Sequence, residues 1–298
     1  MTEFSNNNNF KEINQTVLQL RENYLKSGFT HDTAERFRSI VYSYFRNYGR
    51  GLPWRYSSNP YHIFVSEVML QQTQVERVIP KFRSFIEKFP DFPALASSAF
   101  HEVMDVWQGL GYNRRALSLH NSAKIITDAY GGKLPQEIEQ LKELPGIGYA
   151  TACEITAFAF NKPCVFIETN IRSLYIHIFF PEREKVSDRE ILPLIERTLD
   201  HENPREWYYA LMDFGVFVKK EFGNSGRKSS HYKKQGQFKG SNREIRGLIL
   251  KTLMRKSGLK PRDIAGATGK DAEKIRQNLE ALCREGLVRE SDSLYRIA

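Results

Sequence analysis

The chain of 298 residues has only three cysteines, Cys153, Cys164 and Cys283, and none of them are closely spaced. This count argues against a disulfide framework, a zinc site and an iron–sulfur cluster held by four cysteines of this chain. No apolar run is long enough to cross a bilayer, and the polar, acidic N-terminal sequence has no charged-then-apolar signal segment. We therefore expect an intracellular protein without a metal or a membrane span, in the cytoplasm or nucleoid of a bacterium or the nucleus of a eukaryote.

Acidic residues are also in short supply, since 35 Asp and Glu stand against 44 Lys and Arg and leave a formal charge of +9. Such a surplus favours a polyanionic partner, above all nucleic acid. Hydrophobic residues make up 41% of the chain, enough to bury a core, and the length predicts about two domains.

Apolar residues recur at helical spacing through most of the chain. Between residues 37 and 48 they form one face of an amphipathic helix, and Asp32 followed by Glu35 predicts a capping box at its start. Further helices are expected near residues 61–85, 92–97, 100–107, 114–129, 135–143, 149–160, 170–179, 188–200 and 205–222. Strand-like alternation occurs only at the C-terminal end. The sequence therefore predicts an all-α protein.

The last part of the chain changes character at residues 219–240, where seven Lys and Arg stand against Glu221 alone. This segment is expected to be a solvated linker or a basic loop that contacts phosphates. Residues 241–298 then predict three helices and a two-stranded hairpin, which together describe a winged helix-turn-helix. As a DNA reader, this module would present side chains of its third helix: Lys270, Lys274, Arg276 and Gln277. Acidic residues on the same helix leave a protein-binding or structural module open.

Residues 143–152 read ELPGIGYATA and indicate a tight turn between two helices. Gly146 and Gly148 permit the turn, and the helix start behind it presents backbone N–H groups that suit a phosphate. Taken alone, the pattern also fits an ordinary helix–helix turn.

Together with three other segments, this hairpin resembles the helix-hairpin-helix (HhH-GPD) DNA glycosylase superfamily, most closely its MutY-type adenine glycosylases. The segments are SEVMLQQTQV at 66–75, GLGY at 109–112 and FIETNIR at 166–172. The resemblance covers about residues 36–218 and implies a glycosylase domain, 31–222, with lobes at 59–165 and at 31–58 plus 166–222. A lead-in, 1–30, would precede this domain. A linker, 223–240, and the winged-helix-like module, 241–298, would follow it.

The resemblance implies that a base is flipped out of the duplex and excised. Glu67 matches the family's general acid, Glu168 lies where the superfamily has its catalytic aspartate, and Asn170 matches an asparagine near the active site. From the residues alone, Glu67 also fits a helix surface and Asn170 a helix N-cap. The longer side chain of Glu168 shifts its carboxylate by about a bond length, and a misplacement of ~1 Å can slow a reaction about a hundredfold.

The resemblance also implies DNA contacts. Gln72 and Tyr112, with Leu70 beside them, match positions inserted next to the opposite base, although helix-surface polarity and core packing are simpler readings of the first two. The full set of expected DNA-contacting residues is Leu70, Gln71, Gln72, Thr73, Tyr112, Gly146, Gly148, Tyr149, Ala150, Thr151, Lys219, Lys220, Arg227, Lys228, Lys233 and Lys234.

Besides Glu168, three further features depart from the family pattern. Ala150 replaces the lysine that strand-cleaving members use for Schiff-base chemistry, so no lyase activity is expected. Lys219 and Lys220 stand where relatives begin a four-cysteine cluster motif, so no cofactor is expected. The C-terminal module is not the Nudix-like domain that reads 8-oxoguanine.

The sequence therefore predicts a monofunctional DNA glycosylase that acts on double-stranded DNA with a mispaired or damaged base. The protein is expected to be a monomer. Adenine opposite guanine or 8-oxoguanine is the leading substrate. Hypoxanthine, an alkylated purine, or thymine or uracil opposite guanine are alternatives, as is a non-catalytic sensor of damaged DNA. The C-terminal module is expected to bind DNA or a further protein.

Overall fold

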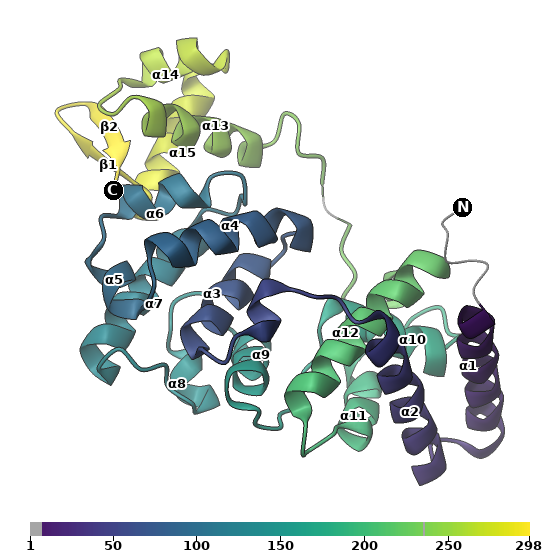
Figure 1. The fold of residues 1–298 in the computed structure, drawn as a ribbon. Coiled ribbons are helices and arrows are strands. Elements are labelled where there is room, and N and C mark those ends of the chain that lie inside the picture. Colours follow the sequence, from purple (N-terminus) through teal and green to yellow (C-terminus); the bar gives the residue numbers. More distant parts are fainter. Residues whose placement is uncertain (1–7, 235) are drawn as a thin grey trace. The chain divides into compact units, whose positions relative to one another are not determined.

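The computed structural model describes residues 8–234 and 236–298, with only the backbone described for residues 8–11. The chain divides into two compact units, each built from two stretches of sequence. Unit 1 contains residues 1–52 and 149–234, and unit 2 contains residues 53–148 and 235–298. Residues 1–7 of the expected lead-in and residue 235 of the expected linker lie outside the described residues. Figure 1 shows the elements in chain order.

Unit 1 is helical in its described residues. Its elements are α1 (Asn8–Ser27), α2 (His31–Tyr48), α9 (Tyr149–Phe160), α10 (Thr169–Phe179), α11 (Asp188–Thr198), α12 (Pro204–Glu221) and the short 3-10 helix η3 (Ser225–Lys228). The expected lead-in thus contains a 20-residue helix, and the expected linker contains a helical turn.

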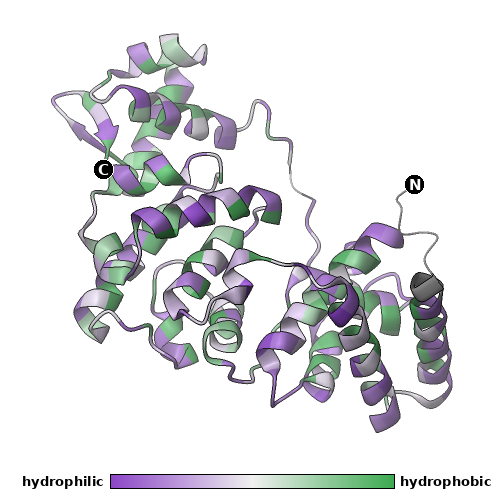
Figure 2. Cartoon of the chain, viewed as in Figure 1, coloured by the Kyte–Doolittle hydropathy of each residue, from purple (hydrophilic) through white to green (hydrophobic). Residues whose placement is uncertain are grey.

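Unit 2 combines a set of helices with the C-terminal module. Its elements are η2 (Pro53–Tyr56), α3 (Pro60–Leu70), α4 (Val75–Lys88), α5 (Phe92–Ser97), α6 (Phe100–Trp107), α7 (Arg114–Tyr130), α8 (Ile138–Lys142), α13 (Asn242–Arg255), α14 (Pro261–Thr268), α15 (Ala272–Arg284), β1 (Val288–Ser291) and β2 (Leu294–Ile297). Most helices in Figure 2 have hydrophilic and hydrophobic residues side by side, as amphipathic helices do. The predicted mainly helical class is confirmed.

Helix α2 begins two residues earlier than the sequence predicted. Thr30 is its N-cap, and the Thr30 and Thr33 side chains each accept a hydrogen bond from the other residue's backbone N–H, both at 3.2 Å. The capping box predicted at Asp32 and Glu35 was therefore wrong. A hydroxyl one residue before the helix reaches the N3 amide directly, which leaves the two carboxylates free to pair with arginines one turn further on.

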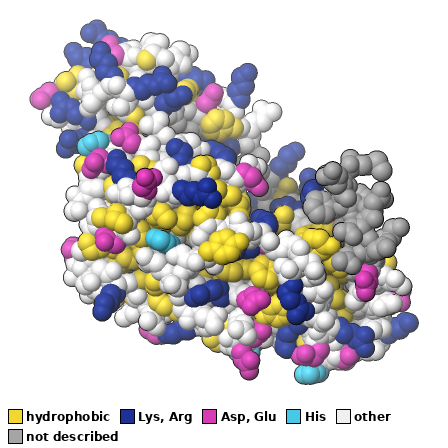
Figure 3. All heavy atoms as spheres, in the orientation of Figure 1, with side chains coloured by type: hydrophobic (Ala, Val, Ile, Leu, Met, Phe, Trp, Pro, Cys, Tyr) yellow, Lys and Arg dark blue, Asp and Glu magenta, His cyan; other side chains and the backbone are white. Residues whose placement is uncertain are grey.

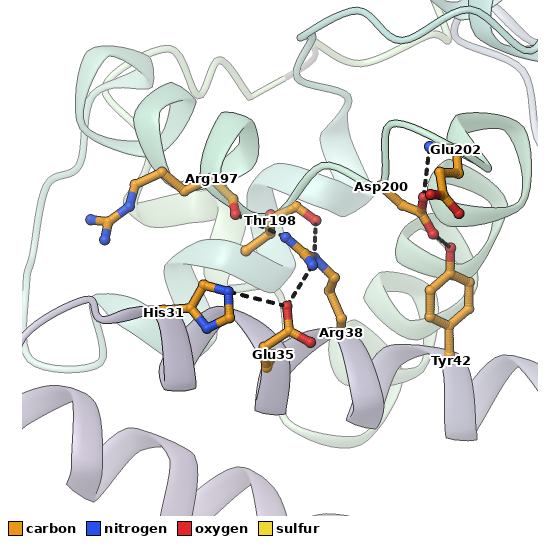
Figure 4. Close-up of polar contacts among 8 residues, drawn as sticks. All are labelled: His31, Glu35, Arg38, Tyr42, Arg197, Thr198, Asp200 and Glu202. Atoms are coloured by element: carbon orange, nitrogen blue, oxygen red, sulfur yellow. Dashed lines mark hydrogen bonds and ion pairs between the residues drawn. The ribbon is translucent and has the colours of Figure 1, made fainter.

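Polar contacts attach α2 to the segment that follows α11 within unit 1 (Figure 4). Arg38 donates from Nε to the carbonyl oxygen of Thr198 at 3.0 Å, and the Tyr42 hydroxyl donates to Asp200 at 2.6 Å. On its buried face, Phe37 meets Trp207 edge-on at 6.0 Å between ring centroids. Helix α2 therefore has an apolar side that forms the core and a polar side that fixes its direction.

Helix α3 is the central helix of unit 2, because eight of its residues are buried. Asn59 caps it by accepting from the backbone N–H of Tyr61 at 2.9 Å, and Pro60 occupies the first helical position, where its missing N–H costs nothing. A short, mostly apolar helix of this kind has no solvated face. Glu67 is the one carboxylate on it.

The C-terminal module folds as the sequence predicted. Helix α15 packs on α13 and α14, and β1 pairs antiparallel with β2 in the register Val288↔Ile297. The hairpin turn places Asp292 and Ser293 at φ of +55° and +60°, which is the twist that a two-residue hairpin loop requires. Three helices and a wing are therefore present.

Among the described residues, no helix is long and apolar enough to cross a membrane.

An ion pair between the buried carboxylate of Asp213 and the 31% exposed side chain of Arg50 links the segment after α2 to α12. The Asp213 side chain, 1% exposed, accepts from the backbone N–H and Nε of Arg50, both at 2.7 Å. Replacing Asp213 by Ala leaves a guanidinium facing a buried site without its carboxylate, so we expect a loss of about 3–5 kcal/mol in the free energy of unfolding, measured by urea denaturation.

The exposed pair Asp32–Arg36 has the same 2.7 Å distance with side chains more than half exposed, and it is the matched control. Asp32→Ala should cost about 1 kcal/mol or less. Equal losses for the two variants would contradict the importance of burial at Asp213.

Candidate active site and nucleic-acid interface

Glu67 lies on the buried helix α3 of unit 2, and the residue is 7% exposed. Its neighbours along the chain, Ser66 and Val68, are buried as well. The predicted alternative of a surface glutamate is therefore wrong, because α3 has no solvated face at this position. A carboxyl held in such a position is shielded from bulk water, as groups that transfer protons in active sites are.

The turn between α3 and α4 carries the predicted contact residues Leu70 to Thr73. Leu70 is the last residue of α3, and Gln72 is exposed with φ at +54°. A glutamine in this left-handed region is uncommon and costs about 1–2 kcal/mol relative to ordinary backbone. The side chain of Gln71 donates to the carbonyl oxygen of Gly146 at 3.3 Å, so this turn also touches the glycine hairpin.

A second turn, between α6 and α7, has the same unusual backbone. Tyr112 has φ at +47° and is 37% exposed, and the glycines before it, Gly109 and Gly111, have φ at +92° and +73°. The sequence alternative of core packing for Tyr112 is therefore wrong. Three left-handed residues within four positions bend the chain sharply and present Tyr112 at the end of the turn.

Arg115 holds the two turns together. One guanidinium nitrogen donates to the carbonyl oxygens of Val68 and Met69 at 2.9 and 2.7 Å, and the other donates to the Thr73 hydroxyl at 2.8 Å and to the Gly111 carbonyl at 3.2 Å. Burial lowers the pKa of Arg115 to about 10, so the guanidinium stays charged at neutral pH.

Hydrogen bonds from a charged donor are each worth about 1.5–3 kcal/mol, so the four contacts outweigh the backbone strain at Gln72 and Tyr112. The Thr73 hydroxyl serves here as an acceptor for Arg115.

The glycine hairpin precedes α9 as predicted. Gly146 has φ at +78°, and a Cβ on it would lie 2.9 Å from the hydroxyl of Ser118, so both conformation and space require glycine. Gly148 has open space around it, and Tyr149 and Ala150 are exposed at the start of α9. Thr151 follows within the same first turn and is partly exposed.

Glu168 is the N-cap of α10 in unit 1. Its carboxylate accepts from the backbone N–H of Asn170 at 2.7 Å and of Ile171 at 3.3 Å, and from the Asn170 side-chain amide at 3.0 Å. Asn170 was expected to be the N-cap if it had no other role. Instead it lies inside the helix and supports the capping carboxylate.

Two opposing effects set the acidity of this group. Burial raises the pKa of Glu168 above its ordinary value, while the N–H groups of Asn170 and Ile171 and the positive charges of Lys219 and Arg172 oppose that rise. The side chain therefore titrates above an exposed glutamate, although three donors and two cations favour its ionised form.

Close packing of α12 against α10 fixes this carboxylate. A Cβ on Gly215 of α12 would lie 2.4 Å from the carbonyl oxygen of Asn170 and 3.1 Å from its Cβ. Only glycine allows the two helices to approach at this point. No local pattern predicted this role, because a single glycine within a helix has no characteristic sequence context.

The basic segment of unit 1 is folded against α10. Lys219 and Lys220 lie in the last turn of α12, and η3 packs on α10, with the Gly226 N–H donating to the Ser173 hydroxyl at 3.3 Å. The ammonium group of Lys228 forms a hydrogen bond within unit 1, because it donates to the carbonyl oxygen of Pro181 at 2.8 Å. The remaining cations of the expected set, Arg227, Lys233 and Lys234, are exposed.

The predicted residues thus fall into two groups. Unit 2 brings together the Gln72 and Tyr112 turns, Glu67 and the glycine hairpin up to Gly148. Unit 1 holds Tyr149 to Thr151, Glu168, Asn170 and the basic segment. The sequence analysis did not identify Arg115 or Gly215. Arg115 forms hydrogen bonds with both turns of unit 2, and Gly215 allows α12 to pack closely against α10 in unit 1.

The contact at Gly215 generates a prediction. Gly215→Ala forces α12 away from α10, so we expect a loss of about 1–3 kcal/mol in the free energy of unfolding and a shifted Asn170 amide signal in NMR spectra. Gly266→Ala is the matched control, because that helix glycine has nothing within 4 Å of an added Cβ and the change should be neutral or stabilising. A Gly215→Ala variant as stable as the wild type would contradict the close approach.

Two segments of the chain match known protein families. Residues 65–197 match the family described as HhH-GPD superfamily base excision DNA repair protein, and residues 242–289 match the family described as winged helix-turn-helix DNA-binding.

Similar curated proteins are adenine DNA glycosylases. That of Buchnera aphidicola subsp. Baizongia pistaciae is 33% identical over 187 residues, covering 61% of this chain and 52% of the relative. That of Mycolicibacterium smegmatis is 33% identical over 178 residues, covering 59% and 61%. The human protein is 32% identical over 202 residues, covering 63% and 37%. The chain spans about half the length of the first of these relatives.

Solved structures show the same fold at low identity. A thermostable thymine-DNA glycosylase aligns with a TM-score of 0.54 and 23% identity over 61% of this chain and 86% of that one. An endonuclease III in a non-covalent DNA complex aligns with a TM-score of 0.56 and 18% identity over 65% and 89%. Residues 65–197 are therefore similar to the HhH-GPD family, adenine DNA glycosylases are among the similar curated proteins, and residues 242–289 are similar to winged helix-turn-helix domains.

Proposed function

We propose that the protein is a monofunctional DNA glycosylase of base excision repair that hydrolyses the N-glycosidic bond of a flipped base. The observation that carries the proposal is the carboxylate of Glu168, partly buried and held by three hydrogen-bond donors at the start of α10. A reaction that builds positive charge on a sugar needs a carboxylate that is fixed in this way.

In this proposal the two carboxylates have different roles. Glu67 donates a proton to a ring nitrogen of the purine, so that the electrons of the breaking C1′–N bond move onto a neutral leaving base. Glu168 in its ionised form stabilises the positive charge that develops on the sugar. A water molecule then adds its oxygen to C1′ and releases a proton, which leaves an abasic site and the free base.

The residue after the glycine hairpin supports hydrolysis without strand cleavage. Strand cleavage by a glycosylase requires an amine that forms a Schiff base with the sugar, and Ala150 has no such group. We therefore propose that the product strand keeps its backbone until alkali or a second enzyme cuts it.

The similar curated proteins are named adenine DNA glycosylases, which supports adenine as the excised base in our proposal. The partner base in our proposal is guanine or 8-oxoguanine. Because the C-terminal module is a winged helix-turn-helix, recognition of the opposite base falls to other residues than in relatives with a Nudix-like domain. Hypoxanthine and thymine opposite guanine are the substrates to test beside adenine.

We also propose that the protein works without an iron–sulfur cluster. Such clusters need four cysteine thiolates, and this chain has three cysteines. Two of them, Cys153 and Cys164, are buried, with the thiol of Cys164 donating to the carbonyl oxygen of Cys153 at 3.1 Å. The donor set does not fit a cluster, and the segment after α12 is folded against α10 through η3 instead.

The proton-donor role of Glu67 leads to a test by single-turnover excision. Glu67→Gln keeps the size and polarity of the side chain but removes its proton donor, so excision of adenine opposite 8-oxoguanine should fall by about 10²–10⁴-fold while duplex binding is retained. The panel should also contain adenine opposite guanine, hypoxanthine and thymine opposite guanine, each product read with and without alkali.

Excision that appears only after alkali, and is lost in Glu67→Gln, is the expected result. Tight binding to a lesion without excision of any base would instead indicate a damage sensor. Cleavage without alkali would overturn the monofunctional assignment.

The electrostatics of Glu168 lead to a test of pH dependence. The proposal needs ionised Glu168, whose pKa is raised by burial, so excision should fall as the pH drops through that raised pKa. Lys219→Gln removes a charge that lowers this pKa, and the acid limb of the pH profile should therefore move to higher pH. Lys220→Gln is the control, because Lys220 is the adjacent lysine of α12 and the change removes the same unit of charge. The same profile in both variants would argue against Glu168 as the titrating group.

A further inference from the structure

A carboxylate of the winged-helix module forms an ion pair with a helix from the other stretch of unit 2. Glu285, just after α15, accepts from Nε of Arg114 at 2.8 Å and from both terminal nitrogens of Arg246. Arg114 begins α7, directly after the Tyr112 turn, and Arg246 belongs to α13. A Cβ on Gly286 would touch Leu117 at 3.6 Å, so the backbone itself is also in contact. The module is therefore part of unit 2.

A groove of about 930 Å³ lies beside this contact, entirely within unit 2. Its lining comes from the turns that carry Gln72 and Tyr112, from the segment before α13 through Phe238, and from α13 through Arg243 and Arg246. The module thus extends the surface on which the two exposed turns lie.

The charged residues of the groove are mostly of one sign. They are five arginines, Arg77, Arg114, Arg115, Arg243 and Arg246, against the single carboxylate of Glu285. That carboxylate already has two arginine partners. The cations include no lysine, and the planar guanidinium fork matches the oxygens of a phosphodiester better than an ammonium does.

Aromatic rings complete the lining. Tyr112 is 37% exposed and Phe238 is 61% exposed. Exposed rings beside arginines form the surface on which proteins stack nucleotide bases while they contact the backbone. This combination selects a nucleic-acid strand over an acidic peptide, which would not need the rings.

The third helix of a winged helix-turn-helix usually reads DNA. In this module, most of the side chains predicted to do so contact acidic residues. Lys270 donates to Glu244 at 3.1 Å, and the side chains of Arg276 and Gln277 both contact Glu273, at 3.4 and 3.2 Å. Three of the four side chains expected to read DNA therefore have acidic partners within the module, whereas Arg243 of the groove has a neutral partner, the carbonyl oxygen of Gly236 at 2.7 Å. Figure 3 shows that its visible face carries carboxylates among the Lys and Arg side chains.

We propose that the groove binds one strand of duplex DNA next to the Gln72 and Tyr112 turns, and that the module contacts DNA through α13 and the preceding segment rather than through α15. Arg243 contacts a phosphate, and Phe238 stacks on a base of that strand that base flipping has unstacked from its neighbours. This proposal rests on the proposed function, because it places the strand beside the turns that enter the duplex.

The test is DNA binding by the full chain, measured by fluorescence anisotropy on a duplex with a stable abasic analogue across a range of salt concentrations. Arg243→Gln should weaken binding by about threefold to tenfold and reduce the salt slope by about 1, since one phosphate contact is lost. Phe238→Ala should weaken binding with an unchanged slope. Arg243→Lys, which keeps the charge, should retain the slope and so exclude a folding defect.

Arg262→Gln on α14, an exposed arginine of the same module outside the groove, is the matched control and should bind like the wild type. Loss of binding in Arg276→Gln with none in Arg243→Gln would move the contact to α15 and overturn the proposal. Wild-type binding in Arg243→Gln and Phe238→Ala would show that the groove does not hold DNA. Because binding is measured without excision, these results stand apart from the outcome of the excision panel.

Discussion

The buried guanidinium of Arg115 is the interaction on which the exposed turns of unit 2 depend. It binds the carbonyl oxygens at the end of α3, the Thr73 hydroxyl and the carbonyl oxygen of Gly111, and so it ties the turn after α3 to the turn before α7. Both turns have residues with positive φ, which an isolated chain would not hold. The same helix that carries Glu67 is thereby fixed at its end, so one cation positions several functional groups.

In unit 1 the corresponding constraint is the meeting of α10 and α12. The carboxylate of Glu168 folds back onto the first amides of α10, and Gly215 lets α12 approach the carbonyl oxygen of Asn170. Partial burial of the carboxylate disfavours its ionised form, and the N–H donors together with the charge of Lys219 oppose that effect.

Positive charge is used for two different purposes in this protein. Arg115, Arg50 and Lys228 are bound to carbonyls or carboxylates and support the fold, whereas Lys233 and Lys234 are exposed, and Arg243 is half-buried with a neutral partner, the carbonyl oxygen of Gly236. The net charge of +9 did not distinguish between these uses, because a buried arginine counts the same as an exposed one. In our proposals only the second group meets DNA phosphates.

Much of the architecture followed from local patterns. Helical spacing, the position of glycines and the C-terminal alternation predicted the helices and the hairpin, because each depends on residues close together in the chain. The motifs at 66–75 and 166–172 predicted the family, and the fold and the family comparison agree with that assignment. The predicted start of α2 was wrong because Asp32 and Glu35 also match the capping-box pattern, whereas Thr30 and Thr33 form the box.

The tertiary structure decided what the local patterns could not. The burial of Arg115, the requirement for Gly215 and the attachment of the module through Glu285 all join residues that are far apart in the sequence. No spacing rule connects Glu285 to Arg114, since the contact exists only when α15 packs beside α7. The sequence by itself therefore determined which elements form and which family they resemble, and long-range packing determined which charges support the site and which remain exposed to a ligand.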